Sequence, residues 1–223
     1  MLDAETKLLV SLEIGPRTER FSRELWDDFA NRTDHVLPEL ITTDEYAPYR
    51  GAILNAYGER VEYPRTGQPG RPRQPRLEPP AGLVYAMVHK TREKGAVVDV
   101  SIRQVFGTQA QLEEALARST VSSHVNTTFV ERFNATVRQH NSRKARKVYS
   151  FSKEFEYHVA MSWFAAANYN FCRPHLGLRE QEDGRWSNRT PAMASGISDH
   201  VWSLDEFMSY PLTHKPFAHV PKH

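Results

Sequence analysis

The segment from Asn126 to Lys147 (NTTFVERFNATVRQHNSRKARK) places one carboxylate among many cations. Glu131 lies near its start, and six lysines and arginines but no acid follow between Arg132 and Lys147. A carboxylate can bind a divalent cation, and a dense run of cations suits a surface that faces phosphates. The segment therefore has the groups needed for metal-dependent chemistry on DNA. The alternative is a helix face whose charges only interact with water.

Helical periodicity divides this segment into two faces. The apolar face consists of Phe129, Phe133 and Val137, at i, i+4 and i+8, and is expected to pack on the protein. Glu131, Asn134 and Arg138 fall together on another face. We expect DNA to be bound by Arg132, Asn134, Arg138, Arg143, Lys144, Arg146 and Lys147. Cations that bind phosphates give affinity with little sequence readout.

Three runs resemble one protein family. The run VERFNATVRQ (130–139) is similar to the glutamate helix of DDE insertion-sequence transposases, and YNFCRPH (169–175) and RTPAMASG (189–196) resemble further motifs of that family. The resemblance implies an α/β fold, a ribonuclease-H-like mixed sheet flanked by helices. It also implies DNA strand cleavage and strand transfer that depend on two Mg²⁺ or Mn²⁺ ions held between three carboxylates. The partners implied are DNA and, for the intact family, further copies of the chain.

The resemblance matches two of the three carboxylates to residues of this chain. Asp44, in ITTDEYAPY, follows an apolar strand and matches the second acid, and Glu131 matches the glutamate. Both are expected to be catalytic residues and metal ligands. Each has a structural alternative, because Asp44 can cap the helix that follows and Glu131 can form a capping box with Thr128.

The first catalytic acid has only a weak candidate. Asp3 is the one early acid that the resemblance can offer as a third catalytic residue, yet its position also suits a turn between two strands. We therefore expect an N-terminally truncated transposase that lacks the first catalytic Asp. The alternative functions are a catalytically inactive remnant that binds DNA or oligomerises, and a structure-selective nuclease on the same fold.

Apolar and polar patterns predict the elements that position these acids. Residues 8–14 are expected to form half of a β-hairpin, and residues 18–31 a helix. A strand at 36–42, which leads to Asp44, and a second helix at 47–57 are expected to follow. After an insertion at about 60–120, a longer helix is expected from Ser152 to about Asn170. The YNFCRPH run should end this helix at Pro174 and place Arg173 or His175 near the active face. The alternative is that the run only packs in the core through Tyr169 and Phe171.

The insertion explains why 86 residues lie between Asp44 and Glu131. It begins with a Pro/Arg-rich loop, 64–80, and continues with a β-hairpin formed by 83–89 and 96–106 and a short helix, 111–118. The loop is expected to be extended. It either contacts DNA through its arginines or is a disordered linker, and its arginines are Arg65, Arg71, Arg73 and Arg76.

Composition gives the class of protein but not its function. The 223 residues fit one main domain, 1–206, with a tail at 207–223. A net charge of +2 does not by itself indicate a nucleic-acid-binding protein. Cys172 is the single cysteine, so no internal disulfide can form, which is typical of a reducing compartment. No apolar run is long enough to cross a membrane, and we expect a cytoplasmic protein.

Overall fold

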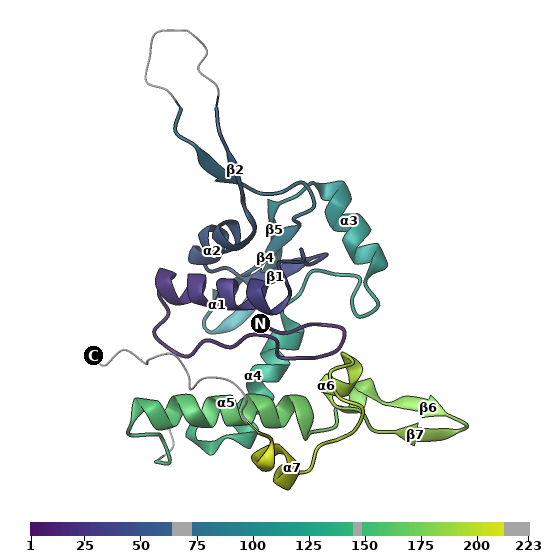
Figure 1. Ribbon diagram of the computed structural model, residues 1–223. Helices are drawn as coiled ribbons and strands as arrows, with labels where there is room; N and C mark the ends of the chain where they lie inside the picture. Colours follow the sequence, from purple (N-terminus) through teal and green to yellow (C-terminus); the bar gives the residue numbers. More distant parts are fainter. Residues whose placement is uncertain (64–72, 145–148, 212–223) are drawn as a thin grey trace. The chain divides into compact units, whose positions relative to one another are not determined.

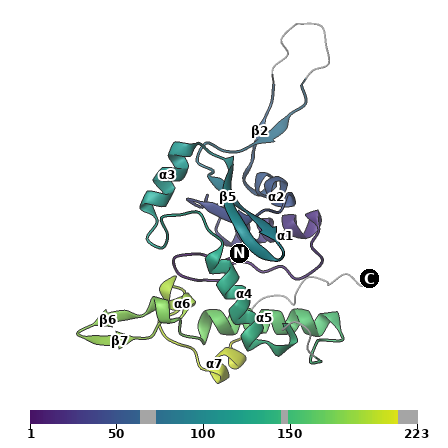
Figure 2. The ribbon, with the colours of Figure 1, turned by 180° about the vertical axis from the view of Figure 1, so that it is seen from behind.

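The computed structural model describes residues 1–63, 73–144 and 149–211 of the chain, and these form two compact units. The sheet unit is Gly15–Thr128, and the helix unit is Met1–Ile14 together with the chain from Phe129 onward. Figures 1 and 2 show the ribbon from opposite sides. The elements of the sheet unit are α1 (Glu19–Arg32), β1 (Ile41–Asp44), α2 (Pro48–Tyr57), β2 (Glu59–Val61), β3 (Arg76–Glu78), β4 (Tyr85–Glu93), β5 (Ala96–Phe106) and α3 (Gln109–Arg118).

The main sheet has the strand order β1-β4-β5 and is mixed. Strand β1 runs parallel to β4, with Asp44 opposite Val88, and β5 runs antiparallel to β4. A two-residue turn joins β4 to β5, and Lys94 and Gly95 both adopt positive φ there, as in the type I′ turns that match the twist of a hairpin. The predicted α/β class and the predicted hairpin are confirmed.

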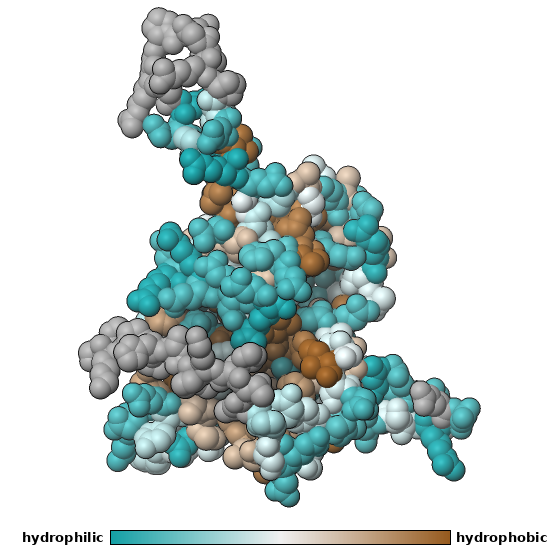
Figure 3. All heavy atoms as spheres, in the orientation of Figure 1, coloured by the Kyte–Doolittle hydropathy of each residue, from teal (hydrophilic) through white to brown (hydrophobic). Residues whose placement is uncertain are grey.

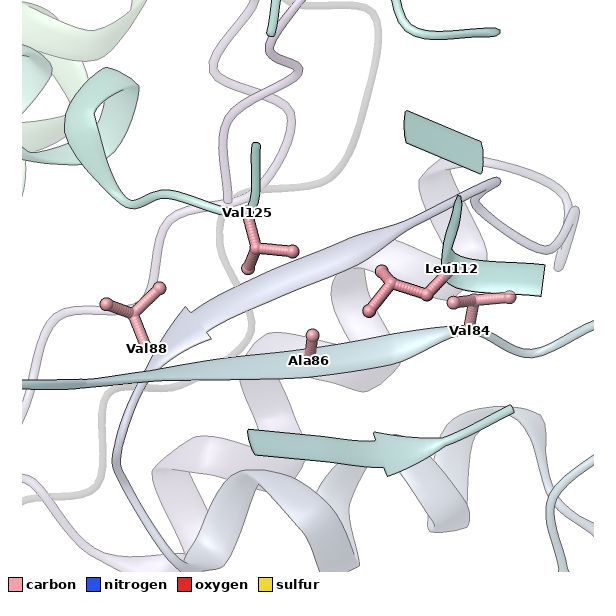
Figure 4. Packing of buried hydrophobic residues seen from close by; sticks show 5 residues of the cluster. All are labelled: Val84, Ala86, Val88, Leu112 and Val125. Atoms are coloured by element: carbon pink, nitrogen blue, oxygen red, sulfur yellow. The ribbon is translucent and has the colours of Figure 1, made fainter. Parts of the chain in front are cut away.

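The first half of the central strand β4, Tyr85–Val88, is buried on both faces, which explains its continuous apolar run. On one face, a core cluster consists of Val84, Ala86, Val88, Leu112 and Val125. Figure 4 shows these side chains gathered between β4, α3 and the segment that precedes α4. On the other face, Tyr85 is fully buried and its ring lies 5.9 Å from that of Phe106.

Helix α1 forms where its sequence predicts it. Thr18 caps it by accepting a hydrogen bond from the backbone N–H of Phe21, and Trp26 and Ala30 are buried one turn apart. Helix α2 packs against α1, where the rings of Trp26 and Tyr49 meet edge to face at 6.3 Å. The predicted strand 36–42 begins later than expected, at Ile41, because Val36 is exposed and Pro38 has no N–H to donate to a ladder.

The helix unit is built around two long helices. Its elements are α4 (Thr128–His140), η1 (Ser142–Lys144), α5 (Phe155–Phe171), η2 (Leu176–Leu178), β6 (Glu180–Glu182), β7 (Arg185–Ser187), α6 (Pro191–Ala194) and α7 (Leu204–Ser209). Its core joins the N-terminal segment to both helices through Leu9, Phe133 and Ala166. The β6–β7 hairpin extends from this unit and is mostly hydrophilic on the face seen in Figure 3.

The predicted hairpin half at residues 8–14 is confirmed only near Leu9, where the N–H of Asp3 donates to the carbonyl of Leu8 and the N–H of Val10 donates to the carbonyl of Met1. The described N-terminal residues make an isolated bridge between Leu2 and Leu9, and no regular strand is assigned there. The buried side chain of Asn170 takes the place of a partner strand. Its Oδ1 accepts from the Leu9 N–H at 3.0 Å, and its Nδ2 donates to the Leu9 carbonyl at 2.9 Å. One amide thus satisfies both backbone groups of a buried residue.

Candidate metal and nucleic-acid site

Asp44 is the last residue of β1 and is exposed at the end of the strand, with 63% of its side chain accessible. Its Oδ2 accepts a hydrogen bond from Nη2 of Arg17 at 3.1 Å. Asp44 does not cap α2, because the N-cap position of that helix is Ala47 and no side chain bonds there. The capping alternative for Asp44 is therefore excluded, and its carboxylate faces solvent and one cation.

Aromatic side chains surround this ion pair. The guanidinium of Arg17 lies 4.1 Å from the centre of the Tyr46 ring, which holds the cation over an aromatic face. Burial raises the pKa of Tyr49, and the negative charge of Asp44 raises it further. Burial also raises the pKa of Tyr85 to about 12, and its hydroxyl bonds Thr43 at 2.8 Å. These phenols stay neutral near pH 7, so they add no charge beside Asp44.

A second carboxylate at the same strand end was not singled out from the sequence. Glu45 follows Asp44, and its Oε2 bonds Nδ1 of His89, the residue after the β4 partner of Asp44. The two consecutive acids Asp44-Glu45 are the sequence signal that points to this second carboxylate. Exposed carboxylate oxygens are the ligands that Mg²⁺ prefers, so the donor atoms of Asp44 fit a hydrated divalent cation. Its contact with Arg17 must open for such an ion to bind.

Glu131 lies in the first turn of α4 and is exposed. The backbone N–H of Thr128, where the helix begins, donates to Oδ1 of Asn126 at 3.0 Å. Asn126 thus serves the start of the helix, and the capping box between Thr128 and Glu131 stays a prediction. The predicted apolar face is confirmed, because Phe133 is buried and its ring meets that of Tyr169 edge to face at 4.9 Å. Glu131 therefore lies away from the packed face of its helix.

Most of the predicted DNA-binding residues are exposed on α4 and η1, namely Arg132, Asn134, Arg138 and Arg143. Lys144 is half-buried, and Arg146 and Lys147 lie outside the described residues. Arg143 donates to Oγ of Ser152 at 3.4 Å. Within the described ranges, none of the four cations from Arg132 to Lys144 forms an ion pair with an acid. Their charge is therefore available to an external anion.

Asp3 holds a turn in the N-terminal segment. Its Oδ2 accepts from the backbone N–H of Thr6 at 2.9 Å and from the Thr6 hydroxyl, and its Oδ1 accepts from the N–H of Glu5 at 3.3 Å. This is the local bonding expected of Asp in a turn. Its role as a third metal ligand stays a prediction.

The structure brings together two cations and a histidine beside the start of α4. Burial lowers the pKa of His175, and the charges of Lys7 and Arg132 lower it further. The Nζ of Lys7 lies 3.9 Å from the centre of the Phe129 ring. Asp44 belongs to the sheet unit, whereas Asp3, Glu131 and the cations belong to the helix unit. Among the residues that the structure describes, no three His, Cys, Asp or Glu side chains gather to hold a metal ion.

The two downstream runs that suggested the family have clear structural roles. Tyr169, Asn170 and Phe171 hold α5 in place through Phe133, Leu9 and Trp202, respectively. The N–H of His175 donates to the carbonyl of Arg189 at 2.8 Å, which joins the two runs. Thr190 then caps α6 by accepting from the N–H of Met193. The packing interpretation of Tyr169 and Phe171 is confirmed.

The Pro/Arg-rich loop falls partly outside the described residues, including Arg65 and Arg71. Arg76 pairs with Glu78, and Arg73 lies 5.5 Å from the centre of the Tyr63 ring. The loop is flanked by β2 and β3, which form an antiparallel pair that the sequence did not predict.

No protein-family model, curated protein or solved structure matches this chain. None of the described helices has the length and apolar character needed to cross a membrane.

Proposed function

We propose that the chain is a DNA-processing enzyme of the DDE transposase type, which cleaves and transfers DNA strands. The supporting observation is the exposed carboxylate of Asp44 at the end of β1, a strand that runs parallel to the buried central strand of a mixed sheet. The finer assignment to a ribonuclease-H-like fold is part of this proposal. Asp44 and Glu131 are the proposed metal ligands.

The residues of the chain have separate tasks in this proposal. Arg132, Arg138 and Arg143 bind the phosphate backbone and orient a strand along α4. Asp44 and Glu131 provide oxygen ligands. Divalent ions held by such carboxylates would activate the attacking hydroxyl and stabilise the leaving oxygen. Arg17 must release Asp44 first, and a DNA phosphate offers its guanidinium another anion.

Nicking of supercoiled plasmid in the presence of Mn²⁺ tests this function. The variants are Asp44→Asn and Glu131→Gln, and the matched control is Glu114→Gln, an exposed acid of α3 that pairs with Arg118. We expect the unaltered chain and the control to nick, and each of the other variants to lose at least roughly 100-fold in rate, since a removed ligand weakens metal-assisted charge stabilisation. Nicking that persists in both Asp44→Asn and Glu131→Gln would contradict the assigned residues.

A second candidate function is DNA binding without cleavage. The ion pair between Asp44 and Arg17 favours it, because a carboxylate already held by a cation is a poorer metal ligand. This candidate predicts that the unaltered chain binds plasmid in a gel-shift assay but produces no nicks at any Mn²⁺ concentration. Mn²⁺-dependent nicks that vanish in Glu131→Gln would exclude it.

A further inference from the structure

The helix unit contains a pocket of about 450 Å³ between α4, η1, α5 and the N-terminal segment. Part of the lining is apolar and consists of Leu9, Leu12, Phe133, Val137 and Ala166. All five residues belong to the core cluster of the unit, where the N-terminal segment, α4 and α5 meet. A volume of this size is typical of pockets that hold a small organic ligand.

The lining of the pocket also contains basic residues. These are Arg138, Arg143, Lys144 and His158. Burial lowers the pKa of Lys144. Burial also lowers the pKa of His158, and the charge of Lys144 lowers it further. Among the described residues that line the pocket there is no aspartate or glutamate. A half-buried lysine beside two arginines, with no acid in the described lining, favours an anionic ligand.

An unpaired nucleotide combines the two properties that this lining selects. Its phosphate is an anion, and its base is a flat, largely apolar ring system. A duplex backbone would satisfy the cations but would leave the apolar part of the pocket empty. Taking a base out of a duplex costs a few kcal/mol, whereas a base at a single-stranded end is already unstacked from a partner. The pocket is therefore better suited to a strand end than to the middle of a duplex.

We propose that this pocket binds one unpaired nucleotide at the end of a DNA strand, with the base against the apolar part of the lining and the phosphate between Arg138, Arg143 and Lys144. The proposal rests on the proposed function, because it takes DNA as the substrate. Asn134, which also lines the pocket, offers an amide to the edge of the base. Base stacking and apolar contact tolerate all four bases, so little sequence preference is expected.

The test measures the affinity of the full chain for three fluorescent duplexes by anisotropy. One duplex is blunt, one carries a single unpaired nucleotide at its 3′ end, and one carries an abasic nucleotide at that position. We expect the overhang to bind roughly tenfold more tightly than the blunt end, and the abasic overhang to lose this gain, because the base supplies it.

Two variants separate the pocket from the rest of the DNA surface. Val137→Phe fills the apolar part of the pocket and should equalise the three affinities while blunt duplex is still bound. Its control is Val130→Phe, an exposed position on the same helix outside the pocket, which should keep the preference. Lys144→Gln removes a cation without adding volume and should reduce affinity for the overhang more than for the blunt duplex. If Val137→Phe does not fold, the affinities of Lys144→Gln alone decide whether the pocket binds the nucleotide.

The failures of the two proposals are distinguishable. Equal affinity of the unaltered chain for all three duplexes would overturn the pocket proposal and leave DNA binding intact. A preference that survives in both Val137→Phe and Lys144→Gln would place the nucleotide elsewhere and would also overturn it. An unaltered chain that binds none of the duplexes would contradict the proposed function itself.

Discussion

Helices α1 and α4 have nearly the same length, 14 and 13 residues, and each buries one face, yet their arginines have different surroundings. In α1 three arginines each pair with an acid one turn away, as Arg20–Glu24 at 2.7 Å, Arg23–Glu19 at 2.5 Å and Arg32–Asp28 at 2.8 Å. In α4 and η1, the described cations have no such acid partners. Figure 3 shows the hydrophilic surface over α1.

The two charged helix faces differ in whether an acid of the same helix neutralises each cation. Pairs at i, i+4 neutralise a solvated face and contribute a few tenths of a kcal/mol each to helix stability. A face whose cations have no acid partner one turn away lacks that stabilisation, and its cations repel one another. Such a face is expected to be useful only when an external anion, such as a nucleic-acid phosphate, completes it. The sequences already differ, because α1 contains four acids and α4 only one.

The largest expected effect comes from reversing charge on α4 and η1. The double variant Arg138→Glu, Arg143→Glu should weaken DNA binding on the order of 100-fold and reduce the salt slope of log K by about 2, since each lost phosphate contact removes about 0.9. Anisotropy at several salt concentrations measures both quantities. The matched control reverses two arginines of α1, Arg20→Glu and Arg23→Glu, and should change affinity much less. Equal losses in the two variants would remove the distinction between the helices.

A smaller effect is expected from the two hydrogen bonds that hold the N-terminal segment on α5. Asn170→Ala should lower the free energy of unfolding by about 2 kcal/mol, because it leaves the buried N–H and carbonyl of Leu9 without partners. Urea unfolding followed by circular dichroism measures this change. Asn168→Ala is the control, since Asn168 bonds Arg173 at an exposed site. A loss no greater than that of the control would mean that the N-terminal segment is not held through this amide.

The smallest effect concerns His200. Like the arginines of α1, this exposed side chain is paired with acids, here Asp199 and Glu206. Asp199 and Glu206 raise its pKa by accepting hydrogen bonds from its ring, so protonated His200 stabilises the folded chain. This contribution is complete below the ordinary pKa of 6.5 and is lost as the pH rises through the raised value. NMR titration should show a lower pKa for His200 in Asp199→Asn. An unchanged pKa would show that the ion pair does not form in solution.

Much of the fold could be predicted because local signals and long-range packing agree. Trp26 and Ala30 follow helical spacing in α1, and the β4–β5 hairpin has apolar strands on either side of Lys94-Gly95. The β6–β7 hairpin was missed although Asp183-Gly184 is a strong turn signal, with both residues at positive φ, because its strands have only three residues each.

The features of the structure that the sequence did not predict depend on contacts between residues far apart in the chain. The Leu9 backbone finds its partner in Asn170, 161 residues away, so the sequence alone suggested a strand there. Similarly, Arg17 lies 27 residues before Asp44, and nothing in the spacing predicted their ion pair. The exposed cations of α4 were predictable because they follow directly from helical geometry once the apolar face is known.

Mn²⁺ binding by isothermal calorimetry tests the central claim most directly, because it probes the carboxylates without requiring cleavage. The full chain is compared with Asp44→Asn, Glu131→Gln and the control Glu114→Gln, with circular dichroism to verify that each is folded. We predict that the unaltered chain and the control bind Mn²⁺ and that each of the other two variants loses this binding. Unchanged binding in Asp44→Asn and Glu131→Gln would show that the metal site does not lie at these residues.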